Sequence, residues 1–224
     1  MGEAIGQVLP AAVGVALSPF PIIAVVLMLT TRRARTNGPA FLAGWLLGLG
    51  VVGTIVLLVA GPADASTGGQ PATWVSWLKI LLGLILLGVA ARQFQGRPHP
   101  GEDVQMPKWM GAVDRFTASQ SVFTGAVLAG ANPKNTVLAV SAAATIAQTG
   151  IGAWQQAVAY TVFAVIGTIG VAAPVVLYLV MGKRSANLLV ALRDWMERHN
   201  AAIMSVICLV IGVKLIGEAI GALT

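Results

Sequence analysis

Two motifs, Ser18-Pro19-Phe20-Pro21 and Asn132-Pro133-Lys134-Asn135, each interrupt a long apolar run, Val8–Thr31 in the first case and Val122–Ala147 in the second. A transmembrane helix needs about 20 apolar residues, and both runs are long enough. Proline removes a backbone donor and clashes with the preceding turn, and Ser or Asn before proline is typical of a helix N-cap. We therefore expect each helix to break, with a half-helix beginning near the membrane centre.

Four further apolar runs have a similar length. Hydrophobic residues make up 57% of the chain and charged residues 10%, whereas about a quarter of a soluble domain is charged. The sequence therefore predicts an all-α membrane protein in which residues 1–224 form a single membrane domain of six transmembrane helices. The expected spans are Val8–Thr31, Pro39–Ala60, Trp74–Ala91, Val122–Ala147, Ala157–Met181 and Ala201–Leu223.

Basic residues alternate between the two sides of these spans. The first, third and fifth connections hold 11 Lys and Arg residues, and the termini and the other connections hold none. Since positive loops stay in the cytoplasm, we expect a bacterial inner-membrane protein with both termini extracytoplasmic. The net charge of +6 is explained by this topology and by anionic lipids, so we do not expect nucleic acid as a partner.

Two connections have the apolar spacing of amphipathic helices. Residues 183–199 are predicted to form a helix lying on the cytoplasmic leaflet, because tryptophan and basic residues flank its apolar face. Residues 94–117 form a cytoplasmic linker whose later part is a second candidate for such a helix. The alternative for both is a short soluble helix packed on loops.

The sequence also matches itself at a shift of 114 residues. Eleven of 44 positions between residues 12 and 55 are then identical, including Pro19 with Pro133 and Thr54 with Thr168. This predicts two repeats, residues 1–93 and 118–224. Because each holds three spans, the second must be inverted relative to the first, as in many secondary transporters. A duplicated membrane protein that transports nothing is the alternative.

The broken helices predict a binding site near the midplane. Helix N-termini carry partial positive charge, and Lys134 adds a full one, so an anionic group is the expected ligand. The alternative is that Lys134 snorkels or satisfies backbone carbonyls. The candidate substrate-binding residues are Ser18, Pro19, Pro21, Asn132, Pro133, Lys134, Asn135, Thr54 and Thr168.

Other intramembrane polar residues give weaker signals. Lys214 and Glu218 lie one helical turn apart and form a candidate coupling pair, with a snorkelling ion pair as the alternative. Lys79 is expected to snorkel. No catalytic cluster, metal-ligand set or nucleotide-binding loop is evident at membrane depth, so we expect neither an enzyme nor a cofactor.

The two proline motifs, together with the basic loop Arg32–Gly38, resemble the GAP family of glycolipid-addressing proteins in the lysine exporter superfamily. That family includes the sulfolipid-1-addressing protein. The resemblance covers nearly the whole chain. It implies six helices from a duplicated three-helix unit, movement of glycolipids across an inner membrane and, together with glycine-rich helix faces, a homodimer.

Three functions follow from these observations. The first is a transporter or flippase for an anionic lipid or glycolipid, working by alternating access. The second is an exporter of a small solute, such as an amino acid or ion. The third is a non-transporting scaffold that assists proteins of lipid biosynthesis or export.

Overall fold

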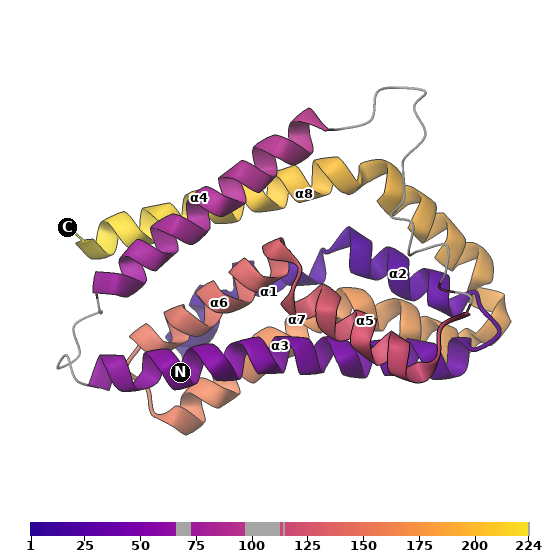
Figure 1. The fold of residues 1–224 in the computed structure, drawn as a ribbon, viewed down its shortest axis with the longest axis horizontal. Helices are drawn as coiled ribbons and strands as arrows, with labels where there is room; N and C mark the ends of the chain where they lie inside the picture. The colour runs from indigo at the N-terminus through magenta and orange to yellow at the C-terminus, as the bar shows by residue number, and fades with distance from the viewer. Residues whose placement is uncertain (66–72, 97–112, 114, 224) are drawn as a thin grey trace.

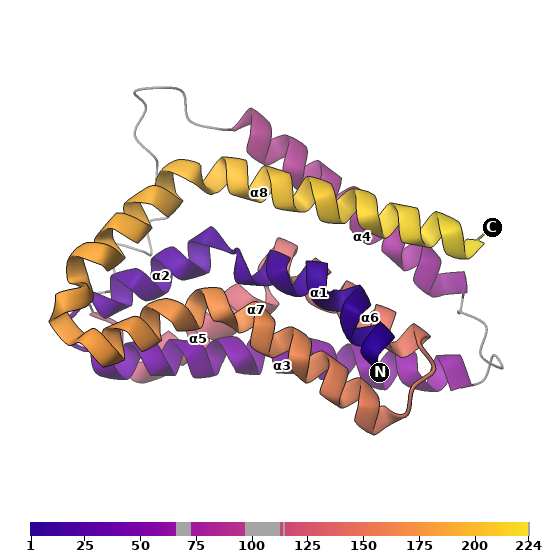
Figure 2. The same ribbon diagram turned by 180° about the vertical axis from the view of Figure 1, so that it is seen from behind.

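The computed structural model describes residues 1–65, 73–96, 113 and 115–223, and all regular structure within them is helical. Figures 1 and 2 show an elongated bundle in which most helices run along the long axis. The helices are α1 (Gly2–Ala16), α2 (Pro19–Leu29), α3 (Ala34–Ala65), α4 (Thr73–Gln95), α5 (Ala118–Gly130), α6 (Pro133–Gln148), α7 (Ala153–Met181), the short 3₁₀ helix η2 (Gly182–Ser185) and α8 (Ala186–Leu223).

The chain is a multi-pass membrane protein. Three helical stretches among the described residues are long and apolar enough to cross a membrane: Ala34–Val59, Trp74–Gln95 and Ala153–Leu223. The pair α1 and α2 becomes a fourth if the two helices count as one bent span. Ala153–Leu223 reverses direction at Gly182, whose φ of 57° suits glycine. The number of six spans stays a prediction.

Both predicted helix breaks are confirmed. The first apolar run is divided into α1 and α2, which meet at an angle of 50°. The run Val122–Ala147 is divided into α5 and α6. Pro19 and Pro133 are each the first residue of the second half-helix. In Figures 1 and 2 both breaks lie near the middle of the long axis.

Glycines set the closest helix crossings. A Cβ atom on Gly44 of α3 would lie 1.9 Å from the carbonyl oxygen of Val122, and one on Gly125 of α5 would lie 2.2 Å from that of Phe41. Gly83 of α4 and Gly212 of α8 face each other's carbonyl oxygens in the same way. Small residues let helix backbones approach closely in membranes. As a result, α4 and the later part of α8 lie side by side along one side of the bundle (Figure 1).

The predicted surface helix over residues 183–199 is not a separate element. After η2, α8 is one helix that continues through the last predicted span. Figures 1 and 2 show that its first part slants across one end of the bundle before α8 turns to run beside α4. The helix continues from the first part into the second because no proline or glycine, the residues least favourable in a helix, separates them. Most of the predicted linker, residues 97–112 and 114, lies outside the described residues.

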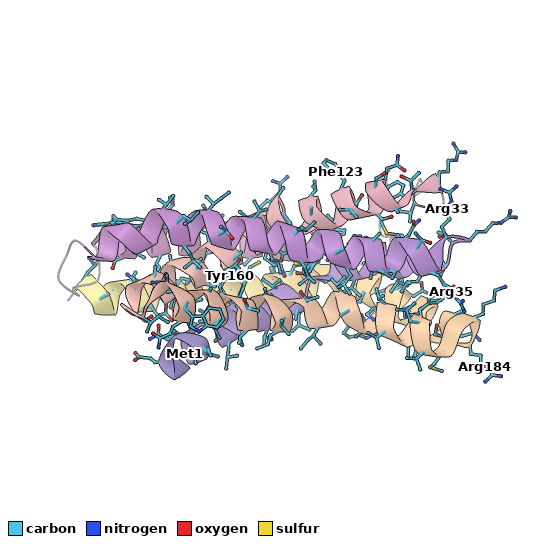
Figure 3. All side chains as sticks on the ribbon, turned by 90° about the horizontal axis from the view of Figure 1, so that it is seen from below. Met1, Arg33, Arg35, Phe123, Tyr160 and Arg184 are labelled. Carbon is cyan, nitrogen blue, oxygen red and sulfur yellow. The ribbon has the colours of Figure 1, made fainter. Side chains whose placement is uncertain are left out.

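Basic side chains gather at one end of the bundle. Figure 3 places Arg33, Arg35 and Arg184 together at that end, with Met1 toward the opposite end. The N- and C-termini lie in the same half of the molecule (Figure 1). These three arginines therefore lie at the end of the long axis away from the termini, as the alternation of basic loops predicts.

Candidate functional site

The two helix breaks share one backbone hydrogen-bond pattern. At the end of α1, the amide of Leu17 donates to the carbonyl of Val13 at 3.0 Å. At the end of α5, the amide of Ala131 donates to the carbonyl of Val127 at 2.8 Å. These residues correspond at the 114-residue shift, as do the last residues of α1 and α5 and the first residues of α2 and α6. The sequence repeat is therefore matched by a repeat in local structure.

Lys134, in the first turn of α6, reaches from one break to the other. Its side chain is buried, with 1% relative exposure. Its Nζ donates to the carbonyl oxygen of Gly14 at 2.6 Å and to Ser18 Oγ at 2.7 Å. Since Gly14 lies in the last turn of α1, whose carbonyls have no helical partner, the ammonium caps the negative end of that helix.

Asn135 completes the connection between the breaks. Its Nδ2 donates to the carbonyl of Leu128 at 3.1 Å, and Leu128 corresponds to Gly14 at the 114-residue shift. Ser18 Oγ lies 2.9 Å from Asn135 Oδ1 and 2.7 Å from the carbonyl of Val15, so its one hydrogen is shared between two acceptors. We call Ser18, Lys134 and Asn135, with the carbonyls of Gly14 and Leu128, the break cluster.

The helix N-termini at the breaks offer fewer donors than the sequence suggests. Pro19 and Pro21 have no N–H, and Ser18 makes no side-chain cap bond to α2. On α6, the amide of Lys134 already donates to Asn132 Oδ1 at 3.1 Å. The ammonium of Lys134 is therefore the main positive group in the break cluster, and the binding of an anion between the two N-termini stays a prediction.

No carboxylate compensates this ammonium among the described residues. Their ion pairs join Lys79 and Lys214 to Glu218, and Arg193 to its neighbours on α8. The partners of Lys134 Nζ are a carbonyl and a hydroxyl, which are neutral. A buried charge with only neutral partners is costly unless a counter-ion reaches it.

Lys214 and Glu218 do form the expected pair, and Lys79 joins it. Glu218 Oε2 lies 3.2 Å from Lys79 Nζ, Glu218 Oε1 contacts Lys214 Nζ, and Lys214 also donates to the carbonyl of Gln7 at 3.2 Å. We call these three charged residues the Lys–Glu–Lys cluster; it joins α4 and α8 to α1. The expectation that Lys79 snorkels is wrong, since its side chain is 8% exposed and paired. The signal for this pairing was Glu218, the one carboxylate in the predicted spans.

The other candidate residues lie apart from the break cluster or only line it. Thr54 is exposed on the outer face of α3, in a shallow hollow with Leu47 and Val51, because the helix turns this face away from the bundle. Thr168 is buried, and its hydroxyl donates to the carbonyl of Ala164 at 2.6 Å. Pro19 and Pro21 are buried, Asn132 is half-buried and Pro133 is exposed.

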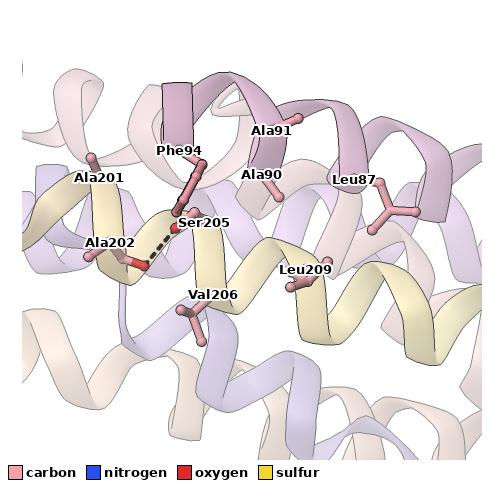
Figure 4. A pocket seen from close by; sticks show the side chains of 9 residues that line it. All are labelled: Leu87, Ala90, Ala91, Phe94, Ala201, Ala202, Ser205, Val206 and Leu209. Carbon is pink, nitrogen blue, oxygen red and sulfur yellow. Dashed lines mark hydrogen bonds between the residues drawn. The ribbon is translucent and has the colours of Figure 1, made fainter. Parts of the chain in front are cut away.

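An apolar groove of about 530 Å³ opens between α4 and α8 (Figure 4). It lies beyond the Gly83–Gly212 crossing and is lined by α4 side chains between Leu87 and Phe94 and by α8 side chains between Ala201 and Leu209. Ser205 is the hydroxyl-bearing residue of the lining, and its Oγ donates to the carbonyl of Ala202 at 3.0 Å. The groove therefore suits an apolar chain better than a polar solute.

Comparison with known proteins identifies the family to which the chain belongs. No curated protein and no solved structure matches the chain. The model of the family described as Sap, sulfolipid-1-addressing protein, matches residues 8–221. This match includes both proline motifs, Lys134 and the Lys–Glu–Lys cluster. The chain thus belongs to the sulfolipid-1-addressing protein family, whose description links it to sulfolipid addressing.

Proposed function

We propose that this protein moves an anionic lipid or glycolipid across the bacterial inner membrane, and that Lys134 pairs with the lipid's charged group on the way. The observation that carries the proposal is a buried ammonium held only by neutral oxygens, between two broken helices. An anionic ligand supplies the missing counter-charge, and a functional role is the default for an ionisable residue at membrane depth. The family match supports a lipid as the ligand.

The helix pairing supports two inverted three-helix repeats. Exchanging the repeats converts α1, α2, α3 and α4 into α5, α6, α7 and α8. The observed pair α3–α5 then becomes α7–α1, which also packs, and α3–α6 becomes α7–α2, which packs too. The pair α4–α8 is unchanged by the exchange, because each of the two helices takes the place of the other. Two related halves around one central site form an arrangement that is common among alternating-access transporters.

The basic end of the bundle favours one orientation. With Arg33, Arg35 and Arg184 on the cytoplasmic side (Figure 3), the two termini lie toward the extracytoplasmic side. The lipid enters from the cytoplasmic leaflet in this scheme. The groove between α4 and α8 gives an acyl chain an apolar path along the bundle, so only the polar headgroup requires a site inside the protein.

The break cluster suggests how binding produces movement. While Lys134 bonds to Gly14 and Ser18, it holds the end of α1 against the start of α6. A sulfate, phosphate or carboxylate group that takes over the ammonium releases this contact. The helices can then change their angle at the breaks, where backbone hydrogen bonds are already interrupted. Binding of the ligand and opening of the helices are thereby the same event.

The test is reconstitution in liposomes that contain fluorescent phosphatidylglycerol, sulfatide or phosphatidylcholine. We compare the wild type with Lys134→Met, which keeps the side-chain length but removes the charge. Lys183→Met is the control, since it removes an exposed cation from the same protein, away from the breaks. We expect Lys134→Met alone to lose transbilayer movement of the anionic lipids.

The other outcomes separate the competing functions. Flux of labelled amino acids that is lost in Lys134→Met identifies a small-solute exporter. If the wild type moves neither lipid nor solute, the protein acts as a scaffold for export proteins. Equal loss in the two variants means that the effect is a general one of charge removal.

A further inference from the structure

We propose that a recess lined by Thr30, Thr31, Arg32, Arg33 and Arg115 binds a phosphate or sulfate ester at the basic end of the bundle. The recess has a volume of about 630 Å³, which lies within the roughly 300–1,000 Å³ range of small-molecule sites. It can therefore hold a polar headgroup and not only a single ion. We call it the arginine recess. It is separate from Lys134 and does not depend on transport.

The arginines come from two segments that are distant in sequence. Arg32 and Arg33 lie in the turn between α2 and α3, and Arg115 precedes α5. A buried amide joins the two segments: Asn37 Nδ2 donates to the carbonyl of Phe116 at 2.9 Å, and Asn37 is 1% exposed. The closeness of the two segments that carry the three arginines is thus built into the fold.

The segment that carries Arg115 is also held firmly at its other side. Thr117 Oγ1 accepts from the amide of Gln120, and Gln120 Oε1 accepts from the amide of Thr117, which together form a capping box at the start of α5. Because Phe116 and Thr117 are both fixed, the backbone next to Arg115 has little freedom. The backbone that carries the three arginines is therefore held in place before a ligand binds.

The three arginines carry charge that the described residues do not compensate. The ion pairs among the described residues involve other side chains. No described carboxylate pairs with Arg32, Arg33 or Arg115. The hydroxyl groups of Thr30 and Thr31 donate to the carbonyls of Leu27 and Met28, each at 2.8 Å. The recess therefore presents guanidinium donors, and its hydroxyl hydrogens are already used at the end of α2.

Geometry and position select the ligand class. A guanidinium group presents a planar fork of N–H donors that matches phosphate and sulfate oxygens in pairs. Arg33 extends from the same end of the bundle as Arg35 and Arg184 (Figure 3), where the apolar helices finish. This is the level of lipid headgroups in a membrane. The same ester chemistry is found in a lipid headgroup and in free phosphate or sulfate, so the experiment must separate these two sources.

The test is native mass spectrometry of the intact protein, released from bilayers of phosphatidylcholine with phosphatidylglycerol or sulfatide. The double variant R32Q/R115Q removes two cations from the arginine recess. The control R35Q/R184Q removes two exposed cations from the same end, outside the recess. We expect the affinity for one anionic lipid to fall roughly tenfold or more in R32Q/R115Q and to stay within about twofold in the control.

Two further arms settle the source and the site. Millimolar inorganic phosphate or sulfate should leave the bound lipid in place, whereas displacement at that concentration would assign the recess to the free ion. Lys134→Met should retain the lipid, because the two sites are separate. Equal loss in both double variants, or no loss in R32Q/R115Q, would overturn the proposal. Unfolding midpoints of all variants distinguish lost binding from lost folding.

Discussion

Replacing Lys134 by Met separates a functional charge from a structural one. The substitution keeps an unbranched side chain of similar length, so no large cavity forms in the break cluster. It removes the two hydrogen bonds of Nζ, to Gly14 O at 2.6 Å and to Ser18 Oγ at 2.7 Å. It also removes a charged group that is 1% exposed. The expected change in stability is the difference between these two effects.

The two effects are of similar size. A hydrogen bond from a charged donor contributes about 1.5–3 kcal/mol, so two of them contribute roughly 3–6 kcal/mol. Taking an ammonium out of water costs several kcal/mol even after the protein relaxes. We therefore expect the free energy of unfolding to change by less than about 2 kcal/mol, while transbilayer movement of anionic lipid falls at least tenfold. A residue selected for structure alone would not show this separation.

The thiol of a buried cysteine can serve as the probe for the stability measurement. Cys208 is the only cysteine of the chain and is buried. A maleimide dye that fluoresces on reaction will therefore report the temperature at which the bundle opens. A decrease in stability of more than about 3 kcal/mol in Lys134→Met would match the loss of hydrogen bonds alone. That result, or unchanged lipid movement, would refute the reasoning that the charge serves the ligand.

Two further predictions use the same thermal assay. Gly44→Ala should lower the unfolding temperature, because its Cβ would lie 1.9 Å from a carbonyl oxygen of α5. The control Gly50→Ala, on the same helix, should leave the unfolding temperature unchanged, because nothing lies within 4 Å of its Cβ. Glu218→Gln should destabilise the bundle because it leaves Lys79 buried without a counter-charge. The loss should stay below the roughly 3–5 kcal/mol of a fully buried pair, since Glu218 is partly exposed. A loss no larger than that of Glu197→Gln, whose basic partner Arg193 is 29% exposed where Lys79 is 8% exposed, would contradict this.

The sequence predicted those features of the site that depend on local chemistry. The breaks at Pro19 and Pro133 follow from the missing amide and the ring of proline, which act wherever the helix lies. The partners of Lys134 could not be predicted in this way. A free carbonyl at Gly14 exists only because α1 ends there, and its meeting with Lys134 requires the packing of α1 on α6. Lys79 was misjudged for the same reason: its choice between lipid headgroups and Glu218 depends on how α4 crosses α8.

Thr54 shows the limit of the repeat as a guide to function. It matches Thr168 at the 114-residue shift, yet one is exposed on the outside of α3 and the other is buried in α7. The two segments share the helix breaks, where proline interrupts the backbone hydrogen bonds. They do not share the use of each face, since α3 and α7 have different neighbours around them. Backbone features were therefore transferable between repeats, whereas side-chain roles were not.

The break cluster is asymmetric, and this asymmetry predicts which break moves. Lys134 and Asn135 correspond to Phe20 and Pro21 in the first repeat, which carry no side-chain donor. The first turn of α6 therefore donates to the carbonyls of Gly14 in α1 and Leu128 in α5, whereas Phe20 and Pro21 of α2 have no side-chain donor that could do so. Asn135 can keep its bond to Leu128, seven residues away in the same repeat, when the bonds from Lys134 to the first repeat are lost.

A ligand that takes over Lys134 should consequently free the α1–α2 break and leave the α5–α6 break intact. Hydrogen exchange measured by mass spectrometry, with and without sulfatide in the bilayer, tests this directly. Amides of residues 17–24 should exchange faster when the anionic lipid is present, and those of residues 131–138 should not change. Lys134→Met should exchange quickly at residues 17–24 even without ligand, because the contact is already missing. Faster exchange at residues 131–138 instead would place the moving hinge in the second repeat and contradict the role assigned to Lys134.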